Sequence, residues 1–174
     1  MPKIIENIRE KLLIEAKRQV IELGYSAMTI RSVATSCGVG IGTVYNYFSS
    51  KDMLVASFML EDWMHCIAVI SERVTGAGQV EEALYCMYQE LLRYKEKYDA
   101  LFTDKNAEAS YAASFMQRHS LLRKQLADPM KKWTCKQNKI DAEFLAEFIA
   151  ENMLSLTMEG KSFELISSVI LQLF

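Results

Sequence analysis

The chain has 174 residues, of which 51% are hydrophobic and 24% are charged, values typical of a soluble globular protein with one or two domains. No apolar run approaches the roughly 20 residues that a membrane-spanning helix needs, and the N-terminus mixes charges of both signs, so neither a membrane segment nor a signal peptide is expected. The four cysteines show no metal-ligand spacing and are expected to be free thiols in a reducing cytoplasm (Cys37, Cys66, Cys86 and Cys135).

The charges are divided unevenly along the chain, although the net charge is only −2. Residues 1–52 carry seven Lys or Arg and five Asp or Glu, whereas the remaining residues carry thirteen and seventeen. A slightly basic head on an acidic body is compatible with binding DNA through one face. Because few phosphates would be neutralised, the pattern also predicts modest non-specific affinity.

The first helix is predicted from Lys3 to Leu23, because apolar residues recur there at helical spacing up to Gly24. The next stretch, Thr29 to Lys51, has the pattern of two short helices joined by a tight turn. Thr29 is suited to cap the first of them, and Gly38 is free to take the left-handed conformation that ends a helix. A small residue at the crossing, a glycine in the turn and an apolar residue on the second helix predict a helix-turn-helix.

The second short helix carries polar and aromatic residues on its predicted outer side. Gly42, Thr43, Asn46 and Tyr47 point outward, and Tyr45 lies near the boundary. Amide and hydroxyl groups on an exposed helix can bond to phosphates and base edges of DNA. A solvated helix in an ordinary bundle is the alternative, and the sequence GTVYNYF followed by Lys51 favours DNA binding.

Residues 13–54 resemble the N-terminal domain of the TetR family of transcriptional regulators. The resemblance rests on these residues: Leu13, Ala16, Gly24, Tyr25, Thr29, Ile30, Val33, Ala34, Gly38, Val39, Gly42, Thr43, Val44, Tyr45, Tyr47, Phe48, Lys51 and Leu54. It implies an N-terminal helix-turn-helix, a divergent helical ligand-binding domain and a homodimer built through C-terminal helices.

By the same resemblance, two groups of residues are expected to contact DNA. Phosphates would be met by Thr29, Thr43, Tyr47 and Lys51. The groove would be met by Ile41, Gly42, Tyr45 and Asn46. Two positions depart from the family pattern: Ile41 stands where a polar or basic residue is common and Gly40 where a hydroxyl residue is common.

The rest of the chain is predicted to be helical as well. A long helix begins at Lys51 and ends near Val74, before the loop Thr75 to Gly78. A second runs from Gln79 to Tyr98, followed by a short helix or turn over residues 99–105. A third, containing Tyr111 to Leu126, ends near Asp128-Pro129, and Pro129 is expected to open one more short helical piece.

Two helices are predicted at the C-terminal end, over residues 141–157 and 162–174. The last is apolar almost all round, and such a helix at a monomer surface favours a partner chain. A homodimer is therefore expected, with these interface residues: Leu145, Phe148, Ile149, Leu156, Phe163, Ile166, Ile170 and Leu173.

A small-molecule pocket is expected from the family resemblance among aromatic and sulfur-containing residues of the middle helices. The candidate lining residues are Trp63, Tyr85, Tyr88, Phe102, Tyr111, Phe115, Met116, His119, Trp133 and Phe144. A cluster of Lys and Arg between Arg118 and Lys139 is expected either to be solvated or to pair with the acidic residues of the helix 141–157. It could alternatively touch DNA or an anionic effector.

The sequence thus predicts an all-α protein with a helix-turn-helix domain over residues 1–52 and a helical regulatory and dimerisation domain over residues 53–174. The predicted function is a homodimeric transcriptional repressor that binds a pseudo-palindromic double-stranded operator and is released by an unknown small molecule. No enzyme activity, metal or cofactor is expected. Control by a protein partner, or by no ligand, is one alternative, and an all-α enzyme with a purely structural helix-turn-helix is another.

Overall fold

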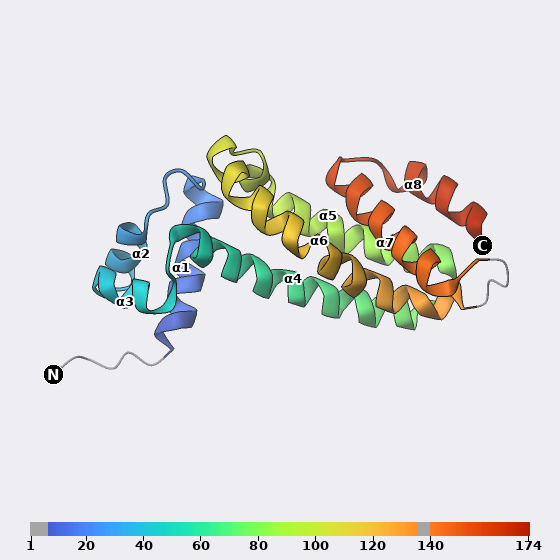
Figure 1. The fold of residues 1–174 in the computed structure, drawn as a ribbon, viewed down its shortest axis with the longest axis horizontal. Coiled ribbons are helices and arrows are strands. Elements are labelled where there is room, and N and C mark those ends of the chain that lie inside the picture. Colours follow the sequence, from blue (N-terminus) through green and yellow to red (C-terminus); the bar gives the residue numbers. More distant parts are fainter. Residues whose placement is uncertain (1–6, 136–139) are drawn as a thin grey trace. The chain divides into compact units, whose positions relative to one another are not determined.

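The computed structural model describes residues 7–135 and 140–174, except for the side chains of Asn106 and of residues 108–120. Every regular element of this described part is helical (Figure 1), which confirms the predicted all-α class. The elements are α1 (Ile8–Leu23), α2 (Ile30–Ser36), α3 (Ile41–Tyr47), α4 (Lys51–Gly76), α5 (Val80–Phe102), α6 (Lys105–Thr134), α7 (Ala142–Met158), α8 (Phe163–Ile170) and the 3₁₀ turn η1 (Leu171–Leu173).

The chain divides into two compact units. One comprises Met1–Asp62 with Lys97–Ser114, and the other comprises Trp63–Glu96 with Phe115–Phe174. The first unit therefore contains the helix-turn-helix, the start of α4 and the end of α5. The domain boundary predicted at residue 52 stays a prediction.

In the first unit, α1 supports the two short helices. It begins at Ile8, directly after Asn7, whose backbone is left-handed with φ 59°. The predicted start at Lys3 lies outside the described residues. Gln19 of α1 is 3% exposed, and its side-chain oxygen accepts a 2.6 Å hydrogen bond from the hydroxyl of Ser32 in α2. This buried polar contact fixes α2 against α1, since a buried amide without its partner is costly.

The turn between α2 and α3 is built by backbone hydrogen bonds. Thr29 caps α2, because its hydroxyl oxygen accepts a 2.9 Å hydrogen bond from the backbone nitrogen of Ser32, and the Thr29 nitrogen donates to the hydroxyl oxygen of Ser32. At the other end, the nitrogens of Gly38 and Val39 donate to the carbonyls of Thr35 and Ala34. Gly38 has φ +67°, the left-handed conformation that this arrangement requires. The predicted cap and turn glycine are both confirmed.

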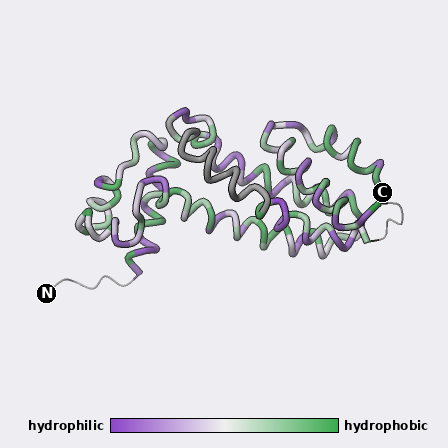
Figure 2. The backbone as a smooth tube through the Cα atoms, in the orientation of Figure 1, coloured by the Kyte–Doolittle hydropathy of each residue, from purple (hydrophilic) through white to green (hydrophobic). Residues whose placement is uncertain are grey.

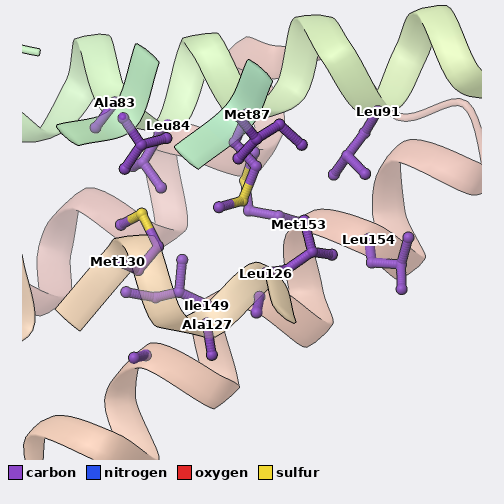
Figure 3. Close-up of a cluster of buried hydrophobic side chains, with 14 of the residues drawn as sticks. Ala83, Leu84, Met87, Leu91, Leu126, Ala127, Met130, Ile149, Met153 and Leu154 are labelled. Carbon is purple, nitrogen blue, oxygen red and sulfur yellow. The ribbon is translucent and has the colours of Figure 1, made fainter. Parts of the chain in front are cut away.

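The second unit has one apolar core between α4, α5, α6, α7 and α8 (Figure 3). Met87 of α5, Leu126 and Met130 of α6, and Met153 of α7 are each fully buried and point toward one another. Methionine suits such a core because its flexible side chain fills irregular gaps.

Two predicted breaks do not occur. α5 continues to Phe102, so most of the short element expected over residues 99–105 is the end of α5. α6 runs through Pro129 without interruption, although a proline inside a helix removes one hydrogen bond. Its neighbours Leu126, Met130 and Trp133 are buried in the core, and their packing outweighs that cost.

Among the described helices, α4 has the length and hydropathy of a membrane span, a test that core helices of globular proteins also pass. This corrects the expectation that no segment approaches that length. α4 contributes Leu54 and Phe58 to the interior of the first unit, and Ile70 and Val74 to the core of the second.

The structure corrects half of the predicted dimer residues. Leu145, Ile149, Ile166 and Ile170 are at most 2% exposed and belong to the core of their own chain, so they have no surface to offer a partner. Leu156, Phe163 and Leu173 are partly buried against the same core. Hydrophobic residues run along α8 (Figure 2), and the residues on α7 and α8 that are both apolar and exposed are Phe144, Phe148, Leu165 and Val169.

Two glycine-to-alanine substitutions are expected to change stability in opposite directions. Gly38→Ala forces a side chain into the left-handed region and should lower the free energy of unfolding by about 1–2 kcal/mol. Gly42→Ala lies inside α3 with no atom within 4 Å of the added carbon. It should raise the free energy of unfolding by about 0.5–1 kcal/mol, because alanine loses less entropy on folding. Urea unfolding followed by circular dichroism measures both, and equal effects would contradict the assignment of the turn.

Candidate nucleic-acid interface

One side of α3 is exposed and the other is anchored. Val44 is fully buried and Phe48, directly after α3, is 3% exposed, so both hold the helix onto the first unit. The four residues predicted to meet the groove, Ile41, Gly42, Tyr45 and Asn46, are all exposed. They stand at positions i, i+1, i+4 and i+5, which places them on one helix face. This groove face presents an amide, a phenol and an apolar side chain around a glycine.

The predicted phosphate contacts lie at the edges of this face. Thr43 is half-buried, and Tyr47, one turn further on, is 47% exposed. Thr29 is exposed, and although its oxygen accepts the cap bond from Ser32, its hydroxyl proton is still able to bond to a phosphate. Their roles in binding stay predictions, since no nucleic acid is present.

Lys51 differs from the expectation of a free cation beyond the recognition helix. It is the first residue of α4, its ammonium group donates to the backbone carbonyl of Tyr25, and it lies 4.0 Å from the centre of the Tyr25 ring. Burial holds the pKa of Lys51 below its usual value. Tyr25 is 6% exposed and its hydroxyl donates to Asp52, the next residue of α4. Lys51 and Asp52 together fasten the segment between α1 and α2.

A residue that sequence reasoning missed is Arg31, an exposed cation in the first turn of α2. The structure gives Arg31 no ion pair among the described residues. The signal that could have identified it is its place two residues after the cap Thr29, between the buried Ile30 and Val33. Because its charge is not used in such a pair, the guanidinium group of Arg31 is available to bind a phosphate or a base edge.

Of the four residues of the basic cluster whose side chains the structure describes, Arg123, Lys131 and Lys132 are engaged within the protein, as one of the predicted alternatives states. Lys131 pairs with Asp128 at 2.9 Å and with Glu143 of α7 at 3.6 Å, and Arg123 lies 3.6 Å from Glu151 of α7. Lys132 donates to the carbonyl of Thr75 at the end of α4. Arg118, Lys136 and Lys139 fall outside the described side chains.

The predicted ligand-lining residues whose side chains the structure describes have different surroundings. Trp63 and Trp133 are buried in the core, with their indole nitrogens bonded to Gln125 at 2.9 Å and to the Val74 carbonyl at 3.3 Å. Tyr85 and Tyr88 pack against Phe163 at 4.9 and 5.6 Å between ring centres.

Exposure corrects part of that set. Phe144, Tyr85 and Phe102 are 63%, 45% and 38% exposed, so these three do not line an enclosed cavity of a single chain. Tyr111, Phe115, Met116 and His119 lie outside the described side chains. No cluster of three or more potential metal ligands occurs in the part of the chain that the structure describes.

Lys51→Ala is expected to act mainly on the fold. Without the ammonium group, the Tyr25 carbonyl and ring lose their contact, and the melting temperature should fall. Because that ammonium group is bound internally, the slope of log DNA affinity against log salt concentration should change by less than the value for one released counterion. Tyr25→Phe is the matched control, since it removes the hydroxyl that bonds to Asp52 and keeps the ring and the carbonyl that Lys51 contacts. If this slope fell by the value for one counterion while the melting temperature stayed unchanged, Lys51 would be shown to bind a phosphate instead.

Comparisons with known proteins give a consistent result. A family model for bacterial regulatory proteins of the tetR family matches residues 12–58. UidR, a transcriptional regulator of Escherichia coli K12, is 21% identical over 126 residues, covering 71% of this chain and 64% of UidR. HbdR of Aromatoleum is 24% identical over 197 residues, covering 92% and 86%. The chain thus spans less than two thirds of UidR but most of HbdR.

Solved structures share the fold at low sequence identity. A TetR-family regulator from Streptomyces coelicolor matches with a TM-score of 0.67 at 17% identity, covering 96% of this chain and 99% of that protein. RolR in complex with resorcinol matches with a TM-score of 0.65 at 16% identity, covering 96% and 87%. UidR, HbdR and the Streptomyces protein are each named as transcriptional regulators. Residues 12–58, which contain the helix-turn-helix, thus match the TetR family of bacterial regulatory proteins, and the chain shares the fold of a TetR-family regulator.

Proposed function

We propose that the protein is a cytoplasmic homodimeric transcriptional repressor that binds a pseudo-palindromic operator through α2 and α3. The observation that carries the proposal is the groove face of α3, with Ile41, Gly42, Tyr45 and Asn46 exposed over the anchored Val44 and Phe48. An α-helix of this kind fits the major groove of DNA. Thr29, Thr43, Tyr47 and Arg31 supply the flanking contacts, while Lys51 acts through Tyr25.

The experiment that tests the proposal is selection of bound duplexes from random double-stranded DNA. The expected product is a pair of inverted half-sites about 34–36 Å apart, or a multiple of that distance, because two recognition helices of a dimer reach successive grooves. Recovery of no enriched sequence would contradict the proposal. A single half-site without its inverted copy would contradict the dimer alone.

The dimer is proposed to form through the exposed apolar residues of α7 and α8. Phe144 and Phe148 stack one turn apart on α7, with ring centres 6.4 Å apart, and Leu165 and Val169 stand one turn apart on α8. These four residues replace the buried set expected from the sequence. Exposed aromatic and aliphatic residues at helical spacing are typical of a helix-packing interface.

We further propose that a small molecule controls DNA binding. RolR, which shares the fold, has been solved with resorcinol bound. A ligand can release DNA only if it binds one arrangement of the dimer better than another. Thermal shift against a library of small molecules, followed by gel shift with each stabilising compound, tests this step, and stabilisation without release of DNA would contradict it.

Asn46 and Tyr47 are expected to contribute in different ways. Asn46→Ala should reduce discrimination at one base pair of each half-site by about 1–3 kcal/mol, because its amide can pair two-fold with adenine. Tyr47→Phe should weaken binding to every site by roughly 1.5–3 kcal/mol at most, because it removes one bond to a phosphate. Selection from random DNA with each variant measures both. The opposite pattern would mean that α3 is rotated in the groove.

Val169→Glu and Ile170→Glu separate the interface from the core. Val169 is 62% exposed and Ile170 is 2% exposed. A charge at Val169 should give a folded monomer, since it is desolvated only in the dimer, whereas a charge at Ile170 should unfold the chain. Light scattering at micromolar concentration and circular dichroism measure the two outcomes. A Val169→Glu dimer would contradict the proposed interface.

A further inference from the structure

Three helices of the first unit meet at the carboxylate of Asp62 in α4. One of its oxygens accepts from the ammonium group of Lys17 in α1 at 2.7 Å. The other accepts from Lys97 and from the hydroxyl of Tyr98, both in α5. We call Lys17, Asp62, Lys97 and Tyr98 the Asp62 junction.

The carboxylate and the hydroxyl of the Asp62 junction are shielded from solvent, whereas the side chains of Lys17 and Lys97 are 29% and 38% exposed. The side chain of Asp62 is 19% exposed, and Tyr98 is 1% exposed. Burial alone would raise the pKa of Asp62, but the hydrogen bonds from Lys17, Lys97 and Tyr98 outweigh it and hold that pKa below its usual value. Burial holds the pKa of Lys97 below its usual value as well, and the neighbouring Lys17 adds to this. Two cations thus share one anion through different oxygens, so the Asp62 carboxylate links α1 to α5.

Tyr98 is held by more than this bond. Its ring stacks on Phe58 of α4 with centres 6.2 Å apart and lies 6.5 Å from Phe102. The last residues of α5 are therefore packed onto the N-terminal half of α4, which also carries Asp62.

α1 transmits this attachment to the helix-turn-helix. Two residues after Lys17, the buried Gln19 accepts from Ser32 of α2. A second contact reaches the same region, because Ser26, between α1 and α2, donates to Asp104 at 3.1 Å, just beyond the end of α5. The end of α5 thus holds both α1 and the segment that leads to α2.

We propose that Lys97 and Tyr98 are positioning residues for DNA binding, which set the orientation of α1, and with it α2 and α3, through Asp62. The inference rests on the proposed function, because the orientation of α1 affects binding only when two recognition helices bind one operator together. The groove face keeps its chemistry when the junction is lost, but its alignment with the second half-site changes.

The test uses the full chain and two measurements. The first is hydrogen exchange of the free protein, in which Lys97→Met should accelerate exchange across residues 8–36 although the substitution lies in α5. The second is affinity for palindromes built from the selected half-site, with the half-site spacing changed by one or two base pairs. Lys97→Met and Asp62→Asn should reduce the wild-type preference for one spacing by about 2- to 30-fold.

Three variants serve as controls. Lys97→Arg keeps the cation and should retain the spacing preference. Glu61→Gln breaks the neighbouring contact between α1 and α4, a 2.9 Å ion pair with Arg9 whose side chains are 53% and 52% exposed. It should leave both measurements unchanged, because exposed pairs contribute little. Tyr98→Phe removes one hydroxyl and keeps the ring stacked on Phe58. It should reduce the spacing preference less than Lys97→Met does.

The outcomes separate this inference from the proposed function. If wild type prefers one spacing and Lys97→Met keeps that preference, the positioning role is wrong while DNA binding stands. Affinity that falls equally at every spacing also overturns the role, since a loss of stability alone acts in that way. If wild type selects no DNA, the proposed function fails, and unchanged exchange over residues 8–36 in Lys97→Met then rejects the positioning role as well.

Discussion

The left-handed turn at Gly38 is the constraint on which the DNA-binding face depends. α2 and α3 have seven residues each, too few to be stable alone, so each exists because it is packed and capped. The bonds from Gly38 and Val39 back to α2 end that helix and reverse the chain. Val44 then enters the interior, and its burial fixes which side of α3 faces out. The exposure of Asn46 and Tyr45 follows from that rotation and not from any property of their own.

The helix-turn-helix could be predicted from the sequence because its determinants are local. A cap, a glycine with positive φ and an apolar residue at fixed offsets are all visible within 23 residues, and the structure places Thr29, Gly38 and Val44 as expected. The C-terminal helices show the limit of the same reasoning. Their apolar pattern reveals that a face is buried, but not whether its own chain or a partner buries it. Ile166 and Ile170 belong to the core, and the exposed Leu165 and Val169 differ from them only by rotation about α8.

Polar contacts between distant residues had no sequence signal at all. No pattern near Asp62 indicates that Lys17 and Lys97, 45 and 35 positions away, share its carboxylate. Likewise, no pattern indicates that Lys51 is bound to the Tyr25 carbonyl. A motif predicts which residue type stands at a position. Tertiary contacts decide whether a charged group at that position is paired within the protein or exposed. Lys51 and Arg31 illustrate the difference. Lys51, which the family pattern places at a phosphate, is bound within the protein, whereas Arg31, which the pattern does not single out, is exposed.

This internal pairing of charges determines which forces the proposed DNA interface of a chain with net charge −2 can use. In α1, Arg18 bonds to Glu15 and Glu22, and Lys17 bonds to Asp62, so these cations add little to any field outside the protein. What the interface then presents is mostly hydroxyl, amide and aromatic groups. Such groups give short-range hydrogen bonds that depend on alignment, while long-range attraction to phosphates stays weak. A protein that binds in this way gains its affinity from having both recognition helices correctly placed at once. The proposed function therefore makes contacts that orient α1 as important to binding as the residues proposed to touch DNA.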